Sequence, residues 1–277
     1  MAKTIFILLD GCGNKLAKEN FGFLEHMCEQ KHAARYNIRG EIPSSSRPLY
    51  ELLLTGAFVC DHGIVNNLIV RESNEQSIFS LCRKNNLSTA AAAYHWISEL
   101  YQSAPFSHLK DRFQFGTQGH IQNGIFYFED MYPDSHVLCD AEYLRAAYMP
   151  DFLLVHTMNI DDIGHRYGSG SKEHAVSALK LDTLLSTVIP LWLQAGYSIV
   201  ITADHSMNAL GLHGGNTPEL RDLPLYLLSD SIKKGIFEKQ LIPQRLMAPL
   251  LCRLLDIEAS EAMCRIEDFE VNFFEED

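Results

Sequence analysis

The sequence predicts an α/β fold with a mostly parallel central sheet and helices on both faces. Short apolar runs, typical of strands that are buried on both faces, recur along the chain with helix-like segments between them. These runs cover residues 4–9, 152–155, 198–202 and 223–228. Such alternation is typical of β-α-β units, in which successive strands are parallel and joined by helices.

The longest predicted helix covers residues 171 to about 194, where leucines and a valine recur along one side. Pro190 is a helix breaker that we expect to kink or shorten it. The sequence contains no repeat, low-complexity tract or linker, so we expect residues 1–277 to form a single domain. Residues 71–150 are expected to be an elaboration that shapes the pocket.

Composition indicates a globular protein with a large core and argues against some classes of partner. Apolar residues make up 47% of the chain and charged residues 21%, as in a globular protein with a large core. The net charge of −12 and the lack of any basic run argue against nucleic-acid binding. The seven cysteines are scattered and form no CxxC pair, which favours reduced thiols over a disulfide framework.

The same features predict a cytoplasmic protein. The N-terminal apolar run is too short for a secretory signal and leads straight into Asp10. No uninterrupted apolar run approaches the roughly 20 residues of a membrane span, so no span is expected.

Carboxylates and imidazoles follow the predicted strands. Asp10, Asp161 and Asp204 each lie shortly after an apolar run, and parallel strands present their carboxyl ends at one edge of the sheet. Two divalent cations about 3.5–4 Å apart need about six ligands of this type. The predicted metal ligands are Asp10, Asp161, His165, Asp204, His205 and His213. Asp162 is an alternative to Asp161, but the four-residue offset to His165 favours Asp161.

These residues occur in an order that resembles the alkaline phosphatase superfamily, and its type I phosphodiesterase/nucleotide pyrophosphatase branch in particular. The resemblance rests on Ser46-Arg47-Pro48, Thr55-Gly56, His62-Gly63-Ile64 and Asn66-Asn67, together with the stretches 161–168 and 204–215. The last two stretches also resemble the catalytic domain of the glycolipid ethanolamine-phosphate transferases. The resemblance covers about half of the chain and implies that residues 1–277 form a single alkaline phosphatase-like catalytic domain.

The resemblance implies a role for each matched residue. Ser46 would attack phosphorus and form a covalent phosphoserine, which activated water then hydrolyses, and Asn67 would support a phosphoryl oxygen. One metal would be held by Asp161, His165 and His213, and the other by Asp10, Asp204 and His205. Asn66 is a rival to Asn67, and Arg47 could also bind phosphate. The metals would be zinc, with manganese an alternative.

The predicted function is therefore that of a phosphodiesterase or nucleotide pyrophosphatase, a phosphoric ester hydrolase with a small phosphate ester or nucleotide as substrate. Asn67, in place of a cationic clamp, favours a diester. A phosphomonoesterase, phosphonate hydrolase or phosphomutase of the same superfamily is an alternative. A non-catalytic protein that binds metal or nucleotide is another.

Overall fold

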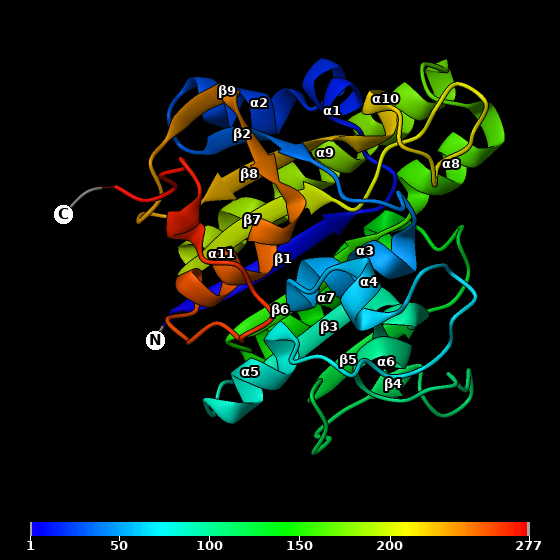
Figure 1. The fold of residues 1–277 in the computed structure, drawn as a ribbon, viewed down its shortest axis with the longest axis vertical. Coiled ribbons are helices and arrows are strands. Elements are labelled where there is room, and N and C mark those ends of the chain that lie inside the picture. Colours follow the sequence, from blue (N-terminus) through cyan, green and yellow to red (C-terminus); the bar gives the residue numbers. More distant parts are fainter. Residues whose placement is uncertain (1, 276–277) are drawn as a thin grey trace.

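One nine-stranded sheet organises the protein, with β1 at its centre (Figure 1). The computed structural model describes residues 2–275. The strand order is β4-β5-β3-β6-β1-β7-β8-β2-β9. The strands are β1 (Lys3–Leu9), β2 (Ala34–Arg39), β3 (Thr89–Tyr94), β4 (Phe113–Gln114), β5 (Asn123–Tyr127), β6 (Phe152–Thr157), β7 (Tyr197–Ala203), β8 (Asp222–Leu228) and β9 (Gly235–Pro243).

The sheet is mostly parallel, which confirms the predicted fold class. β1 pairs in parallel with β6 on one side and β7 on the other, and its apolar side chains are fully buried. The predicted strand at residues 223–228 exists as β8, but it runs antiparallel to both β7 and β2. The connection from β7 stays at the carboxyl edge and contains only the short helix α10 (Pro218–Arg221), so the chain turns back along β7.

Helices cover both faces of the sheet (Figure 1). One face carries α1 (Asn14–Asn20), α2 (Gly22–Glu29), α7 (Asp134–Tyr148), α8 (Asn159–Tyr167) and α9 (Lys172–Gln194). The other carries α3 (Ser46–Thr55), α4 (Val59–His62), α5 (Ile78–Lys84), α6 (His95–Tyr101) and α11 (Met247–Leu254). Two short 3₁₀ turns, η1 (Gln244–Leu246) and η2 (Ile266–Asp268), complete the described elements.

Residues 71–150 extend the same sheet. Strand β3 pairs in parallel with β6, and β5 pairs in parallel with β3, so the carboxyl ends of both strands reach the edge at which β1 and β7 end. Helix α6 follows β3 directly and packs close to α3. This region therefore lies beside the residues that follow β1 and β6.

Helix α9 matches the predicted helix. The Ser171 side chain caps its first turn by accepting a hydrogen bond from the His174 backbone N–H at 3.2 Å, and the helix continues through Pro190 to Gln194. Contrary to our expectation, its length and composition are sufficient for a membrane span. One such helix is weak support for a span, because α9 also packs against β7 and α8 as a core-covering helix does.

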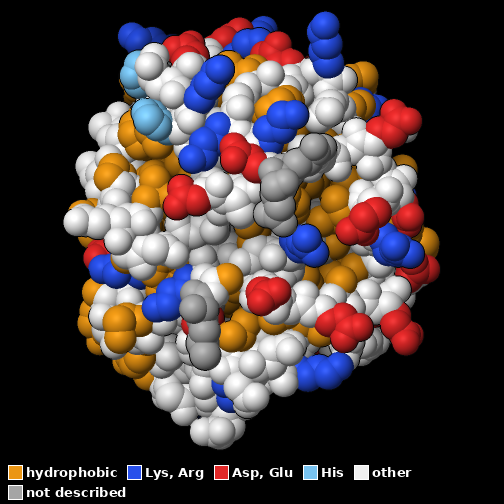
Figure 2. Space-filling model, turned by 90° about the vertical axis from the view of Figure 1, so that its left-hand side faces the viewer, with side chains coloured by type: hydrophobic (Ala, Val, Ile, Leu, Met, Phe, Trp, Pro, Cys, Tyr) orange, Lys and Arg blue, Asp and Glu red, His pale blue; other side chains and the backbone are white. Residues whose placement is uncertain are grey.

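Acidic and basic side chains are interspersed on the face that holds the amino ends of the central parallel strands (Figure 2). Apolar side chains show between them, and neither sign of charge forms a continuous patch among the described residues on this face. The predicted site lies at the opposite edge of the sheet.

Candidate metal centre and nucleophile

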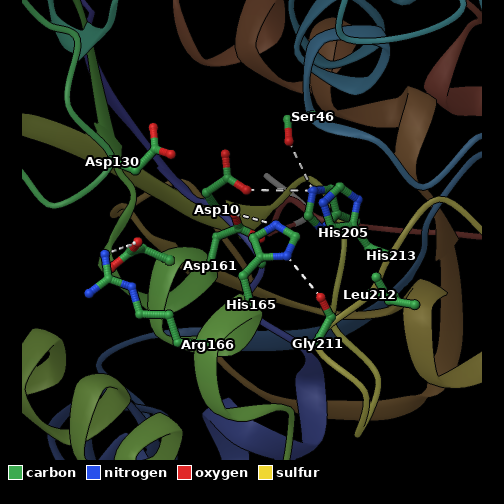
Figure 3. A network of polar contacts seen from close by, with 12 residues as sticks. Asp10, Ser46, Asp130, Asp161, His165, Arg166, His205, Gly211, Leu212 and His213 are labelled. Atoms are coloured by element: carbon green, nitrogen blue, oxygen red, sulfur yellow. Dashed lines mark hydrogen bonds and ion pairs between the residues drawn. The ribbon is translucent and has the colours of Figure 1, made fainter.

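Three adjacent strands bring the predicted ligands together. Asp10 follows β1, Asp161 lies in the first turn of α8 after β6, and Asp204 follows β7. Because β6, β1 and β7 are neighbours in the sheet, their carboxyl ends meet. Figure 3 shows Asp10, Asp161, His165, His205 and His213 around one space, with Ser46 facing it from the opposite side.

Two compact groups of possible metal ligands occupy this space. Asp10, Asp204 and His205 form one group, as predicted. The other consists of Asp161, His205 and His213, so His205 takes the place that we predicted for His165. The His165 Nε2 atom nevertheless lies 3.2 Å from Asp161 Oδ2, at the rim of this second group.

Backbone carbonyls orient all three histidines in the same way. The Nδ1 atom of His165 lies 2.8 Å from the Gly211 carbonyl oxygen, that of His213 lies 2.9 Å from the Ser44 carbonyl, and that of His205 lies 3.2 Å from the Ser206 carbonyl. A carbonyl oxygen only accepts, so Nδ1 carries the proton and Nε2 of the neutral ring is left with a free lone pair. Such a tautomer is the one in which Nε2 can bind a metal.

The carboxylates also suit cations. Asp10, Asp161 and Asp204 are buried, and the oxygens Asp10 Oδ1, Asp161 Oδ1 and Asp204 Oδ2 have no hydrogen-bond partner among the described residues. Burial and repulsion from neighbouring carboxylates raise the pKa of Asp161 and Asp204. Burial acts in the same direction on Asp10, but contacts with His156, His205 and Tyr50 lower its pKa to about 2. Bound cations would satisfy the free oxygens and remove the repulsion.

Ser46 faces the site, whereas its two neighbours do not. Its Oγ lies 3.0 Å from His205 Nε2, and Ser46 is the first residue of α3. The Ser44 hydroxyl donates to the Gly215 carbonyl at 3.0 Å, and the Ser45 hydroxyl donates to Asn67 Oδ1 at 2.9 Å. The tertiary structure therefore distinguishes among three consecutive serines that the local sequence leaves nearly equivalent.

Asn67 lies beside the nucleophile candidate. Its Oδ1 also accepts the Arg47 backbone N–H at 3.0 Å, so it caps the first turn of α3. The hydrogen bonds among described residues leave its Nδ2 free to donate. The rival Asn66 instead caps its own loop through Leu68, and Asp162, the rival of Asp161, pairs with Arg166 at 2.7 Å.

Arg47 does not reach the site, contrary to our expectation that it could bind phosphate. Its guanidinium is 1% exposed and lies 4.6 Å from the centre of the Trp96 ring. Its Nη2 lies 2.7 Å from Glu99 Oε2, which ties the first turn of α3 to α6. The pair anchors the backbone beside Ser46, and the sequence contains no local pattern that announces a partner 52 residues away.

Two further residues beside the site were missed by sequence reasoning. His156 contacts Asp10 Oδ2 through Nε2 at 3.2 Å, and the Tyr50 hydroxyl donates to the same oxygen. His156 has no ligand spacing in the sequence, so the motifs do not single it out. Its position one residue after the apolar run 152–155 was the available indication, because β6 extends to Thr157 and carries His156 to the site edge.

A cavity of about 640 Å³ lies beside the site rather than over Ser46. It is lined by α1, the start of α9 and the segment Ser206–Met207, which directly follows His205. At the end of β3, Tyr94 donates a hydrogen bond to Asp130 at 2.8 Å, and Figure 3 draws Asp130 on the Asp10 side of the network. That residues 71–150 shape the pocket stays a prediction.

Comparisons with solved structures support the fold. Over 94% of the chain, the fold matches 96% of murine ectonucleotide pyrophosphatase/phosphodiesterase 5, solved as an inactive variant with AMP, with a TM-score of 0.74 and 13% identity. The human counterpart matches with a TM-score of 0.73 and 15% identity over 93% of this chain and 96% of that one. At such low identity the likeness concerns the fold.

Curated relatives match shorter stretches. GPI ethanolamine phosphate transferase 2 of Schizosaccharomyces pombe is 29% identical over 126 residues, which is 39% of this chain and 17% of that protein. The catalytic subunit of human GPI ethanolamine phosphate transferase 3 is 27% identical over 113 residues, 39% of this chain and 10% of that protein. This chain therefore spans a small part of the relatives' length.

The family comparison covers most of the chain. The family model described as type I phosphodiesterase/nucleotide pyrophosphatase matches residues 4–137 and 102–222. These ranges contain Asp10, Ser46 and the other predicted site residues up to His213. The chain belongs to the type I phosphodiesterase/nucleotide pyrophosphatase family, within the alkaline phosphatase superfamily.

Proposed function

We propose that this protein is a metal-dependent phosphodiesterase or nucleotide pyrophosphatase that acts through a phosphoserine on Ser46. One observation carries the proposal: the Ser46 hydroxyl and the free oxygens of Asp10 and Asp204 converge on His205 Nε2. The distances from His205 Nε2 to Ser46 Oγ, Asp10 Oδ1 and Asp204 Oδ2 are 3.0, 3.5 and 3.2 Å, respectively. A nucleophile next to unsatisfied ligands is the arrangement that two-cation phosphoryl transfer needs.

The site residues suit two divalent cations, zinc or manganese. Asp10, Asp204 and His205 would hold one, while Asp161 and His213, with His165 at the rim, would hold the other. When bound, the cations supply positive charge that lowers the pKa of a nearby hydroxyl and stabilises the transferring phosphoryl group. Their charge also offsets the three buried carboxylates.

The chain's own groups account for the remaining chemistry. The Ser46 oxygen forms a bond to phosphorus as its proton passes to solvent, and the bond from phosphorus to the leaving oxygen breaks. A water oxygen then bonds to phosphorus, the bond from phosphorus to the Ser46 oxygen breaks, and Ser46 regains a proton. At the start of α3, Asn67 Nδ2 and the Ser46 backbone N–H are left to donate to a phosphoryl oxygen, because the Arg47 N–H donates to Asn67 Oδ1 and Pro48 has no N–H.

A diester substrate suits these donors better than a monoester. A phosphoryl group in a diester carries one negative charge fewer, and the neutral amide of Asn67 lies where a cationic side chain would favour the more charged monoester. Arg47, the cation nearest to Ser46 in sequence, is paired with Glu99 and turned away. The AMP complex of the murine structural neighbour supports a nucleotide as one substrate class to be tested.

Transfer to an alcohol instead of water is the second candidate. It is favoured by the two ethanolamine phosphate transferases that resemble 39% of this chain. Both reactions would share the phosphoserine and differ in what attacks it. Added alcohols that accept the phosphoryl group at the expense of hydrolysis would indicate transferase activity.

The test compares two chromogenic esters and one variant. We expect the zinc- or manganese-loaded protein to cleave bis-p-nitrophenyl phosphate faster than p-nitrophenyl phosphate. Ser46→Ala should lose turnover while it retains two equivalents of metal, and Ser198→Ala, whose hydroxyl contacts Ser229 away from the site, should match the wild type. A preference for the monoester would contradict the diesterase assignment. Full activity of Ser46→Ala would exclude Ser46 as the nucleophile.

A further inference from the structure

The two carboxylate oxygens of Asp10 have different surroundings. Oδ2 accepts hydrogen bonds from the Tyr50 hydroxyl and from His156 Nε2 at 3.2 Å. Oδ1 has no hydrogen-bond partner among the described residues and lies 3.5 Å from His205 Nε2. The carboxylate is therefore held through one oxygen, and the other is presented to the group that includes Asp204 and His205.

Tyr50 links this carboxylate to the helix that carries the nucleophile. It lies four residues after Ser46 on α3, so the two side chains occupy the same side of the helix one turn apart. Tyr50 is fully buried, and its ring packs edge-on against His156 with 5.0 Å between ring centres. The hydroxyl thus connects α3 to the end of β1 across the core.

A second tyrosine contacts His156 through the ring nitrogen that does not face Asp10. An ionised carboxylate only accepts, so His156 Nε2 donates to Asp10. The Tyr127 hydroxyl donates to the His156 carbonyl oxygen at 3.0 Å, and its oxygen lies 2.9 Å from His156 Nδ1. Tyr127 is the last residue of β5 and His156 lies one residue before the end of β6, and β3 lies between these two strands in the sheet.

We propose that Tyr50 and His156 are positioning residues that fix the rotation of Asp10, so that Oδ1 faces a cation shared with Asp204 and His205. Tyr127 supports them by packing against the His156 ring. The inference rests on the proposed two-metal function. Partners of this kind, which hydrogen-bond a metal ligand from behind, change metal affinity by roughly 10–100-fold when removed.

The test measures metal binding directly. Full-length protein stripped with a chelator is titrated with Zn²⁺ in competition with a chromophoric chelator. We expect the wild type to bind two equivalents tightly, and Tyr50→Phe to bind one of them roughly 10–100-fold more weakly. The matched control is Tyr197→Phe, which removes another buried tyrosine hydroxyl, one that donates to the Pro150 carbonyl at 2.8 Å. It should bind both equivalents as the wild type does.

Two variants of His156 provide an independent arm. Gln at this position keeps an N–H donor for Asp10, whereas Leu removes it, so zinc affinity should follow the order wild type, His156→Gln, His156→Leu. Melting curves of the metal-free variants identify any that fail to fold, and only folded variants are compared. In the folded variants kcat for bis-p-nitrophenyl phosphate should fall while KM stays within about twofold, because Asp10 does not contact the leaving group.

The outcomes separate this inference from the function on which it rests. A wild type that binds two zinc ions, with Tyr50→Phe and His156→Leu binding them equally well, overturns the positioning role alone. An equal loss in Tyr197→Phe overturns it too, because the effect would then be general. A wild-type protein that binds no zinc or manganese contradicts the proposed function instead.

Discussion

Replacing Glu99 by Leu tests how firmly the start of α3 is held. The Arg47 guanidinium is 1% exposed, and Glu99 Oε2 at 2.7 Å is its acceptor. Its Nε and Nη1 have no hydrogen-bond partner among the described residues. Glu99→Leu therefore leaves a buried cation with the face of Trp96, 4.6 Å away, as its remaining favourable contact.

The expected cost is large. Removing one partner of a buried ion pair destabilises a protein by about 3–5 kcal/mol, because the remaining charge is desolvated without compensation. With an unfolding entropy of about 2.1 cal/mol/K per residue over 277 residues, this corresponds to a decrease in Tm of roughly 5–9 °C. Ser46 should also be displaced, so kcat should fall.

Scanning calorimetry and urea unfolding of the metal-free protein measure this cost. The double variant Arg47→Met with Glu99→Leu should recover most of the stability, since it removes both charges and keeps apolar volume. Glu267→Leu is the matched control, because its contact with Arg265 at 4.0 Å is exposed and should cost less than about 1 kcal/mol. A cost below about 1 kcal/mol for Glu99→Leu, or a double variant as unstable as the single one, would refute the reasoning.

Three further predictions concern the site. Gly11→Ala should weaken zinc binding in the same chelator competition, because the new Cβ would lie 2.8 Å from the Asp161 Cα and Oδ1. The control is Gly196→Ala, where φ is similarly positive but the space around the new Cβ is open, so this variant should lose stability and keep its metal affinity. The hydrogen bond to Asp161 raises the pKa of His165 to about 9, so this side chain binds more protons in the folded metal-free chain than in the unfolded chain between pH 6.5 and 9. Its contribution to stability in urea should be lost as pH rises through this window, so stability should fall less steeply in His165→Asn, and an equal slope in both proteins would contradict this. Stripping metal with a chelator should abolish diester cleavage, and zinc or manganese should restore it; unchanged turnover in the stripped protein would exclude a metal requirement.

The prediction of the fold succeeded where strands are central and apolar. The run 4–9 becomes β1 and is buried on both faces, and the leucine pattern after Ser171 becomes α9. The direction of β8 could not be predicted, because an apolar run looks the same for a parallel and for an antiparallel strand. The geometry of the connection that precedes β8 determines its direction. For the region 71–150, β3 owes its place to pairing with β6, a contact between residues about 60 positions apart.

The site was predictable to the extent that chemistry follows strand ends. Asp10, Asp161 and Asp204 were expected at one edge, and the structure brings them there. Their roles as metal ligands remain predictions, as do those of Ser46 and Asn67. His213 was expected beside Asp161 and is found there, but the presence of His205 in place of His165 was not predictable. His205 and His213 stack at 3.9 Å between ring centres through a loop whose path the spacing does not specify.

The sequence by itself determined the class of fold and the chemical types gathered at the edge, because buried parallel strands leave little freedom in where their carboxyl ends lie. Tertiary structure alone decided orientation: which of three serines faces His205, which oxygen of Asp10 is free, and why Arg47 turns inward. The physical reason is that a side chain's direction is set by partners from distant segments. Tyr50, His156 and Glu99 become neighbours of the site only when the sheet and α3 have packed together.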